Sequence, residues 1–346
     1  MIVIGIDPHK QTHTAVAVNS GTGEVLAERT IRARREGFGR LLAWARSLDD
    51  ERVFAVEDCR HVSGGLERYL IARGERAVRV APKLMAAHRR TDRTFGKSDS
   101  IDAKAVAIAA LRHAGLPEAH LVGAEREIDL LAAHREDLVA ERTRSCNRLR
   151  WLLHDLDPEL APAKGALDRD AALERLRELL QALPASVELA ICLDLVSRIA
   201  QVNVRERELA REIDRRVREV APALLEIPGC AALTAAKIVA ETANVSRFAT
   251  EARFAMHAGV APLQASSGAS HRHRLNRRGN RQLNAALHRI AVTQVRIHEP
   301  ARAFVARKRA EGMSNREALR CLKRQLARAV FTTMRTMNSP VAETAA

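Results

Sequence analysis

The sequence IVIGIDPHKQTHTAVAV, residues 2–18, starts with a short run rich in β-branched residues that ends at Asp7. Residues 13–18 then alternate in polarity, which is typical of a half-buried strand. The glycines at positions 21 and 23 predict a turn, after which residues 24–31 can return as a third strand. The chain therefore opens with a predicted three-strand meander.

Helices and strands alternate after this meander. Helical spacing predicts helices over residues 37–48, 66–72, 83–90 and 98–114, and short apolar runs predict strands over residues 52–56 and 77–80. A strand meander followed by alternating helices and strands is typical of a mixed sheet covered by helices. We therefore expect an α/β domain over residues 1–117.

Four acidic residues stand at the ends of these predicted elements. Asp7 ends the first strand, and Glu57 ends the fourth. Asp99 and Asp102 are three residues apart at the start of a helix, so they share one face of it. If the first and fourth strands are neighbours, the four carboxylates converge and repel one another unless cations neutralise them. Oxygen-only ligation favours Mg²⁺ or Mn²⁺, and two such ions can clamp a phosphodiester.

Each of these residues also has a plainer interpretation. Asp7 precedes a proline and can be a turn former, while Glu57 can be a solvated acid at a strand end, with Asp58 as a rival for its role. The helical pair can belong to a solvated helix terminus. Lys10 and Lys97 can contact phosphate or simply be surface charge. The sequence alone leaves these alternatives open.

The composition limits the class of partner. A chain of 346 residues with 47% apolar residues can form two domains with cores, and its net charge of +15 indicates a polyanion binder, although a basic surface without a partner is the alternative. Aromatic residues make up 3%, so base stacking is not the expected mode of binding. No apolar segment approaches membrane-spanning length, the N-terminus lacks a signal-peptide pattern, and the five cysteines form no CxxC pair. We expect a cytoplasmic, nucleoid-associated protein without a membrane partner.

The middle of the chain, residues 118–223, is predicted to be helical. The periodic segments are residues 125–154, 170–183 and 186–220, and a proline-rich stretch at residues 157–167 separates the first two. This pattern predicts a helical hairpin or coiled coil. The segment is either a packed spacer or an oligomerisation arm that also contacts nucleic acid through Arg142, Arg144, Arg148 and Arg150.

The last predicted domain, residues 224–337, is mainly α-helical and is followed by a tail, residues 338–346, that we expect to be disordered. Its Pro228-Gly229 turn is similar to a helix-hairpin-helix, in which backbone N–H groups approach a phosphate. The second glycine of that motif is missing, so a structural turn is an equal alternative. A basic run, HRHRLNRRGNRQ at residues 271–282, supplies further candidates for contact with nucleic acid: Arg272, Arg274, Arg277, Arg278 and Asn280.

Motifs at both ends of the chain resemble those of IS110-type transposases. The N-terminal motifs are GIDPHKQTHTAVAV, VEDC and KSDSIDAKAVA, and the C-terminal order is AGVAP, Ser-Gly, a basic run and Gly-Asn. The resemblance implies an N-terminal domain similar to the Holliday-junction resolvase RuvC, with an RNase H-like fold and a D-E-D-D acidic set. By motif, that set falls on Asp7, Glu57, Asp99 and Asp102, which would hold Mg²⁺ or Mn²⁺. Pro8 departs from the usual GIDVHK or GIDAHK opening.

The resemblance also implies a second catalytic group and further partners. The family's nucleophile is a serine immediately before a glycine, which matches Ser267, with Ser266 as the near rival. Its attack would link the protein to DNA through a phosphoserine. A structured non-coding RNA encoded by the element would pair with donor and target DNA. The middle segment would be a coiled coil that helps subunits assemble into a dimer or tetramer with composite centres.

The sequence leaves three functions open. The first is a transposase that recombines DNA through the acidic set and the serine. The second is a RuvC-like metal-dependent nuclease or junction resolvase that hydrolyses DNA without a covalent serine link. The third is a non-catalytic nucleic-acid-binding protein, against which the intact acidic set argues. A covalent protein–DNA adduct separates the first from the others.

Overall fold

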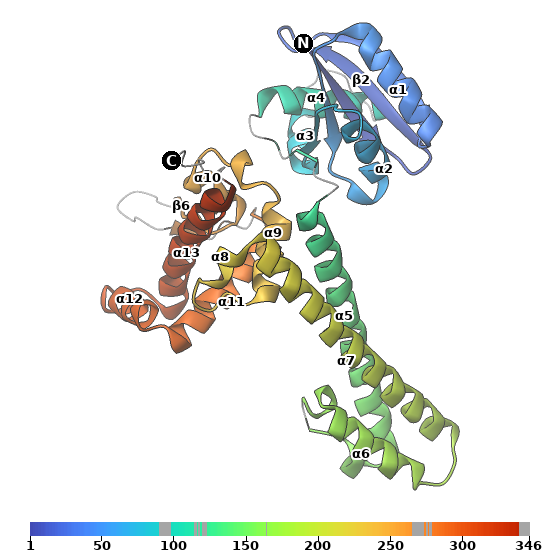
Figure 1. Cartoon of the computed structure of the whole chain (residues 1–346), viewed down its shortest axis with the longest axis vertical. Coiled ribbons are helices and arrows are strands. Elements are labelled where there is room, and N and C mark those ends of the chain that lie inside the picture. Colours follow the sequence, from blue (N-terminus) through green and yellow to red (C-terminus); the bar gives the residue numbers. More distant parts are fainter. Residues whose placement is uncertain are drawn as a thin grey trace, which may run out of the picture. The chain divides into compact units, whose positions relative to one another are not determined.

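The computed structural model describes residues 1–89, 98–113, 116, 118–119, 123–163, 165–264, 273–274, 276 and 279–338. The chain divides into two compact units (Figure 1). Residues 1–123 with 244–253 form the first unit, and residues 124–243 with 254–346 form the second. None of the described helices combines the length and apolar character needed to span a bilayer.

A five-stranded mixed sheet of order β3-β2-β1-β4-β5 organises the first unit. Its strands are β1 (Ile2–Pro8), β2 (Thr12–Asn19), β3 (Val25–Arg32), β4 (Arg52–Glu57) and β5 (Ala77–Val80). β2 pairs antiparallel with both β1 and β3, whereas β4 and β5 run parallel to β1. The predicted mixed-sheet, RNase H-like domain is confirmed.

Helices cover both faces of this sheet (Figure 1): α1 (Arg35–Leu48) and α2 (Arg60–Ile71) pack on one face, and α3 (Pro82–Arg89) and α4 (Asp99–Arg112) on the other. Successive side chains of a strand point to opposite faces. Ile4 and Ile6 of β1 belong to the core under α1 and α2, whereas Val3 belongs to the core under α4. The odd-numbered residues of β1 therefore face α4.

Helix α2 begins earlier than the sequence pattern predicts. The prediction starts at residue 66, but the helix begins at Arg60 and includes two glycines, Gly64 and Gly65. Each glycine in a helix interior is unfavourable by about 1 kcal/mol relative to alanine. Here Gly65 lies against the ring of Phe38, and Ser63 donates a buried hydrogen bond to Glu67. These tertiary contacts outweigh the local preference.

Helices make up most of the second unit. They are α5 (Ala124–Leu156), α6 (Asp170–Gln181), α7 (Val187–Val220), α8 (Pro222–Leu225), α9 (Ala232–Thr242), α11 (Arg281–Ile297), α12 (Glu299–Ala310) and α13 (Asn315–Asn338). Helix α10 (Glu251–His257) spans the boundary between the units, and β6 (Leu263–Gln264) pairs with β7 (His273–Arg274). The predicted helical middle and C-terminal segments are confirmed.

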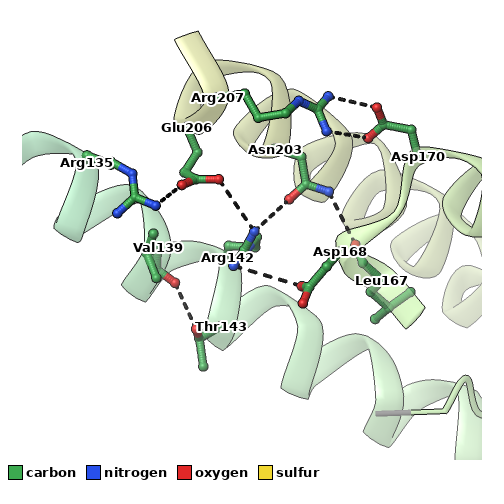
Figure 2. A network of polar contacts seen from close by, with 10 residues as sticks. All are labelled: Arg135, Val139, Arg142, Thr143, Leu167, Asp168, Asp170, Asn203, Glu206 and Arg207. Carbon is green, nitrogen blue, oxygen red and sulfur yellow. Dashed lines mark hydrogen bonds and ion pairs between the residues drawn. The ribbon is translucent and has the colours of Figure 1, made fainter. Parts of the chain in front are cut away.

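Helices α5 and α7 pack along each other as a hairpin arm, with α6 at its far end (Figure 1). A polar network crosses this arm (Figure 2). Arg142 donates to Oδ1 of Asn203 at 3.2 Å, and Nδ2 of Asn203, which is 1% exposed, donates to the carbonyl of Leu167 at 3.2 Å. Glu206 and Asp168 also pair with Arg142. The guanidinium of Arg142 is thus already paired within the arm. Arg144 and Arg148 are exposed instead, and they make no ion pair with any described residue.

Candidate functional site

The parallel pairing of β1 with β4 brings two acids together. Ile6 is in register with Val56, so the next residues, Asp7 and Glu57, stand side by side at the carboxyl ends of these strands. Both belong to the face that α4 covers, and each carboxyl group affects the pKa of the other. Asp7 is buried, with 5% of its surface exposed.

Gly5 determines how closely α4 approaches this pair. A Cβ on Gly5 would lie 2.0 Å from the Ala103 carbonyl oxygen and 2.5 Å from the Ala107 nitrogen. The helix therefore lies directly on the β1 backbone. Ser98 caps it, since its Oγ accepts from the Ile101 N–H at 3.3 Å. The first turn of α4 consequently stands next to the end of β1.

This first turn carries the other two acids. Asp102 is 8% exposed, whereas the side chain of Asp99 is half exposed. Burial is the main cause that raises the pKa of Asp7 and of Glu57, and repulsion from neighbouring carboxylates adds to it. Asp99 and Asp102 both repel Asp7, and Asp102 repels Glu57. The structure thus brings the four acids that the sequence analysis selected into one cluster.

His9 belongs to the same cluster, although the sequence analysis did not select it. Its Nε2 lies 3.3 Å from Oδ2 of Asp7 and 3.4 Å from Oδ1 of Asp99. One ligand atom from each of these three residues lies within 4.8 Å of the others, as the donors of one cation must. The clustered carboxylates fit a divalent ion such as Mg²⁺ or Mn²⁺, whereas an imidazole ligand is more typical of softer transition metals. The available sequence signal was its position, two residues after Asp7.

The neighbouring candidates differ in placement. Asp58, the rival of Glu57, lies 3.9 Å from Arg79, which pairs with the fully buried Glu67 of α2. Asp58 follows the last residue of β4 and is not among the carboxylates that act on the pKa of Asp7 or of Glu57. Lys10 is exposed in the turn after β1, beside His9. Lys97 lies outside the described residues.

The predicted nucleophile also lies outside the described residues, as do its rival and three arginines of the basic run: Ser267, Ser266, Arg272, Arg277 and Arg278. Of Arg274, the structure describes the backbone in β7. The described parts are the two ends of this segment, which we call the stem: residues 256–264 on one side and residues 273–274, 276 and 279–280 on the other.

Close backbone packing holds the stem together. Leu263 pairs with Arg274 in the short β6–β7 ladder. Farther from the serine segment, a Cβ on Gly279 would lie 2.2 Å from Cα of Gly259. The next residue, Asn280, caps α11 through Oδ1, donates from Nδ2 to Glu241 at 2.7 Å, and donates from its backbone to the stem at residue 257. Both groups of its side-chain amide are therefore engaged within the protein, and its contact with nucleic acid stays a prediction.

The Pro228-Gly229 turn packs against α11. Gly229 has φ +80°, and a Cβ there would lie 3.1 Å from the side chain of Thr293. Gln294 donates to the Pro228 carbonyl at 2.8 Å. These contacts give the glycine a packing role, which favours the structural turn over a phosphate-binding hairpin.

Comparison with known proteins gives two family matches. Residues 4–158 match the DEDD transposase family of IS110 type, and residues 221–306 match the transposase IS116/IS110/IS902 family. The uncharacterized 44.8 kDa protein of insertion element IS116 from Streptomyces clavuligerus is 28% identical over 396 residues, covering 99% of this chain and 98% of that protein. The uncharacterized 43.6 kDa protein of insertion element IS110 from Streptomyces coelicolor is 28% identical over 69% of this chain and 71% of its own length. Among solved structures, T. thermophilus RuvC in complex with a Holliday junction substrate is 16% identical over 32% of this chain and 93% of its own, with a TM-score of 0.26.

Proposed function

The chain belongs to the IS110 family of insertion-element transposases, and on this premise we propose that it cuts and rejoins DNA through two centres that act on one phosphate. The first centre is the acidic set, Asp7, Glu57, Asp99 and Asp102. The second is Ser267. The observation that carries the proposal is the convergence of four carboxylates from β1, β4 and α4 at one edge of the sheet.

The acidic set is the proposed binding site for Mg²⁺, with Mn²⁺ as an alternative. Divalent ions bound there would stabilise the charge on the attacking and leaving oxygens of a phosphodiester. The protein's part is to hold carboxylates together in spite of their repulsion, which the direct contact between Gly5 and α4 supports. The exposed side of the cluster, at Asp99 and His9, leaves a way in for DNA.

Ser267 is the proposed nucleophile. Its Oγ forms a bond to phosphorus as the hydroxyl proton leaves, the bond from phosphorus to the departing deoxyribose oxygen breaks, and that oxygen takes up a proton. The phosphoserine keeps the phosphodiester available for rejoining. The proposed phosphate contacts are the basic residues Lys10, Lys97, Arg272, Arg274, Arg277 and Arg278, whose charge would offset that on the phosphate oxygens.

The proposed partners are DNA, a structured non-coding guide RNA and further copies of this chain. A net charge of +15 favours binding of both nucleic acids. In the proposed oligomer, the acids of one subunit and the serine of another form each centre. The hairpin arm of α5 and α7 is the proposed assembly element.

Trapping of a covalent protein–DNA adduct tests this function. Wild-type protein, guide RNA, donor DNA and MgCl₂ are mixed and denatured, and the adduct is sought on a denaturing gel. We expect an adduct with the wild type and with Ser266→Ala, and none with Ser267→Ala. Cutting without an adduct would instead favour a hydrolytic junction resolvase. If Asp102→Ala leaves both cutting and adduct formation intact, the acidic set has no part in the chemistry.

A further inference from the structure

Lys323 of α13 is a buried amine with an unusual environment. It is 8% exposed, and its Nζ donates to Oδ1 of Asn284 at 2.9 Å. No carboxylate among the described residues forms an ion pair with it. The neighbouring charge that affects its pKa belongs to Arg320, a second cation. By contrast Lys237, which is 6% exposed, forms an ion pair with Glu136 at 2.8 Å.

Burying an ammonium group without a counter-ion is unfavourable. A methionine at position 323 would fill nearly the same volume in α13 without this penalty. Burial and Arg320 both lower the pKa of Lys323, as expected for a cation in this environment. A lysine that is buried without a counter-ion therefore indicates a role that packing alone does not explain.

Asn284 of α11 connects this amine to the stem. An amine carries donors only, so its contact with Oδ1 turns the Nδ2 group of Asn284 away from it. Nδ2 donates to the carbonyl of Ala258 at 2.9 Å and to that of Gly259 at 3.1 Å. Lys323 therefore fixes the orientation of an amide that clamps two consecutive carbonyls.

These two carbonyls lie at a tight point of the stem. Gly259 has φ +69° and packs against Gly279, so the two sides of the stem are in backbone contact there. From that point the chain runs through β6 into residues 265–272, which include Ser267, and returns through β7. A shift of the clamped carbonyls would displace the base of the serine segment.

We propose that Lys323 is a positioning residue for the nucleophile: through Asn284 it holds the stem of the serine segment so that Ser267 can attack a DNA phosphate. This inference rests on the proposed function. Lys323 acts through Asn284, without contact with the reacting atoms. A 1 Å misplacement of a reacting group can lower a rate by about 100-fold, so a clamp of this kind matters for the rate.

The test compares adduct formation, DNA affinity and thermal unfolding in Lys323→Met, Lys323→Arg and Asn284→Ala. We expect Lys323→Met to lower the rate of adduct formation at saturating DNA by up to about 100-fold. The DNA dissociation constant should not rise, because Lys323 does not contact DNA. The unfolding temperature should not fall, because the variant no longer buries a charge. Lys323→Arg, which keeps the donor, should restore most of the rate. Lys237→Met is the matched control and should keep the wild-type rate.

A double-mutant cycle tests the route through Asn284. If Lys323 acts on the stem only through Asn284, the double variant Lys323→Met and Asn284→Ala forms the adduct no more slowly than the slower single variant. Independent, additive losses would overturn the inference. So would a wild-type rate in Lys323→Met, or a loss that follows a lowered unfolding temperature.

Amide hydrogen exchange keeps this inference separate from the proposed function. If the wild type forms no adduct, the serine mechanism fails, but the clamp can still be measured. We expect residues 257–264 to exchange faster in Lys323→Met than in the wild type and in Lys237→Met. Unchanged exchange in this segment would show that Lys323 does not hold the stem.

Discussion

Gly5 of β1 and Ala103 of α4 are in direct backbone contact: a Cβ on Gly5 would lie 2.0 Å from the Ala103 carbonyl oxygen. Ala103 directly follows Asp102, and Gly5 lies two residues before Asp7. The distance between the acids of the strand and those of the helix therefore depends on a position without a side chain. The glycine of the GID motif is explained by this contact.

We predict that Gly5→Ala damages both stability and ion binding. The added methyl group must push α4 off the sheet, and overpacking of this kind lowers the free energy of unfolding by about 1–3 kcal/mol. Displacement of Asp102 should also weaken Mn²⁺ binding. Urea unfolding and calorimetric titration with MnCl₂ measure the two effects. Gly21→Ala is the control, because the nearest atom to its Cβ would be Oδ1 of Asn19 at 3.4 Å.

We predict that Asp7→Asn stabilises the metal-free protein while it removes the response to metal. The pKa of Asp7 is raised by burial and by repulsion from Asp102 and Asp99. A raised folded-state pKa favours folding at pH values below the ordinary 3.8, and this contribution is lost as the pH rises through the raised value. At neutral pH the ionised carboxylate is therefore unfavourable without a cation.

Thermal unfolding in EDTA and in MgCl₂ distinguishes these effects. The wild type should gain stability with Mg²⁺, whereas Asp7→Asn should start higher in EDTA and gain little. Strand cutting should fall by about 1,000-fold or more, since metal ions supply several kcal/mol of transition-state stabilisation. Equal responses of both proteins to Mg²⁺ would contradict a metal site at Asp7.

We predict that His13 makes the protein less stable in mild acid. It is fully buried, its ring stacks on Phe38 at 5.7 Å, and its two ring nitrogens make no hydrogen bond of normal geometry with the described part of the chain. Burial lowers its pKa from 6.5, and the Thr12 backbone opposes only part of this shift. Between the lowered and ordinary pKa values, the unfolded chain binds a proton that the folded chain does not, so the free energy of unfolding falls as the pH drops below 6.5.

Urea unfolding of the wild type and His13→Phe at about pH 7.5 and about pH 5.5 measures this dependence. The wild type should lose more stability than the variant over this interval. The same pH dependence in both proteins would mean that another group titrates.

The first unit could be predicted in detail because its signals are local. Alternation within strands and the turn glycines give the meander, and strand ends give Asp7 and Glu57. His9 was missed because its role depends on α4, which lies about 90 residues later in the chain and brings Asp99 to it. Periodicity assigns no partner to a histidine in a turn.

Buried polar contacts in the second unit were not predictable for the same reason. The sequence shows Lys323 as one more cation in a basic helix, and its burial depends on α11, where Asn284 lies. Likewise Arg142 belongs to a charged run, although it bonds Asn203, which is 61 residues away. Charge patterns identify a basic helix, but not which of its cations are already paired.

The difference between the paired Arg142 and the exposed arginines of α5 gives a prediction for the arm. Arg142→Ala removes the donor to Oδ1 of the buried Asn203, and the loss of a hydrogen bond to a charged group lowers the free energy of unfolding by about 1.5–3 kcal/mol. Because this arginine is already paired, its removal should leave the salt dependence of DNA binding unchanged. The double variant Arg144→Ala and Arg148→Ala should have the opposite phenotype, because both side chains are exposed.

If the arm binds a duplex through Arg144 and Arg148, their removal lowers the magnitude of the slope of log K against log salt by about 0.9 for each phosphate that is no longer neutralised. Nucleic-acid affinity measured over a salt series, beside urea unfolding of the same proteins, gives both quantities. A reduced slope in Arg142→Ala would show that this arginine leaves Asn203 to bind phosphate. An unchanged slope in the double variant would leave α5 with assembly as its role, since its exposed cations would then face solvent.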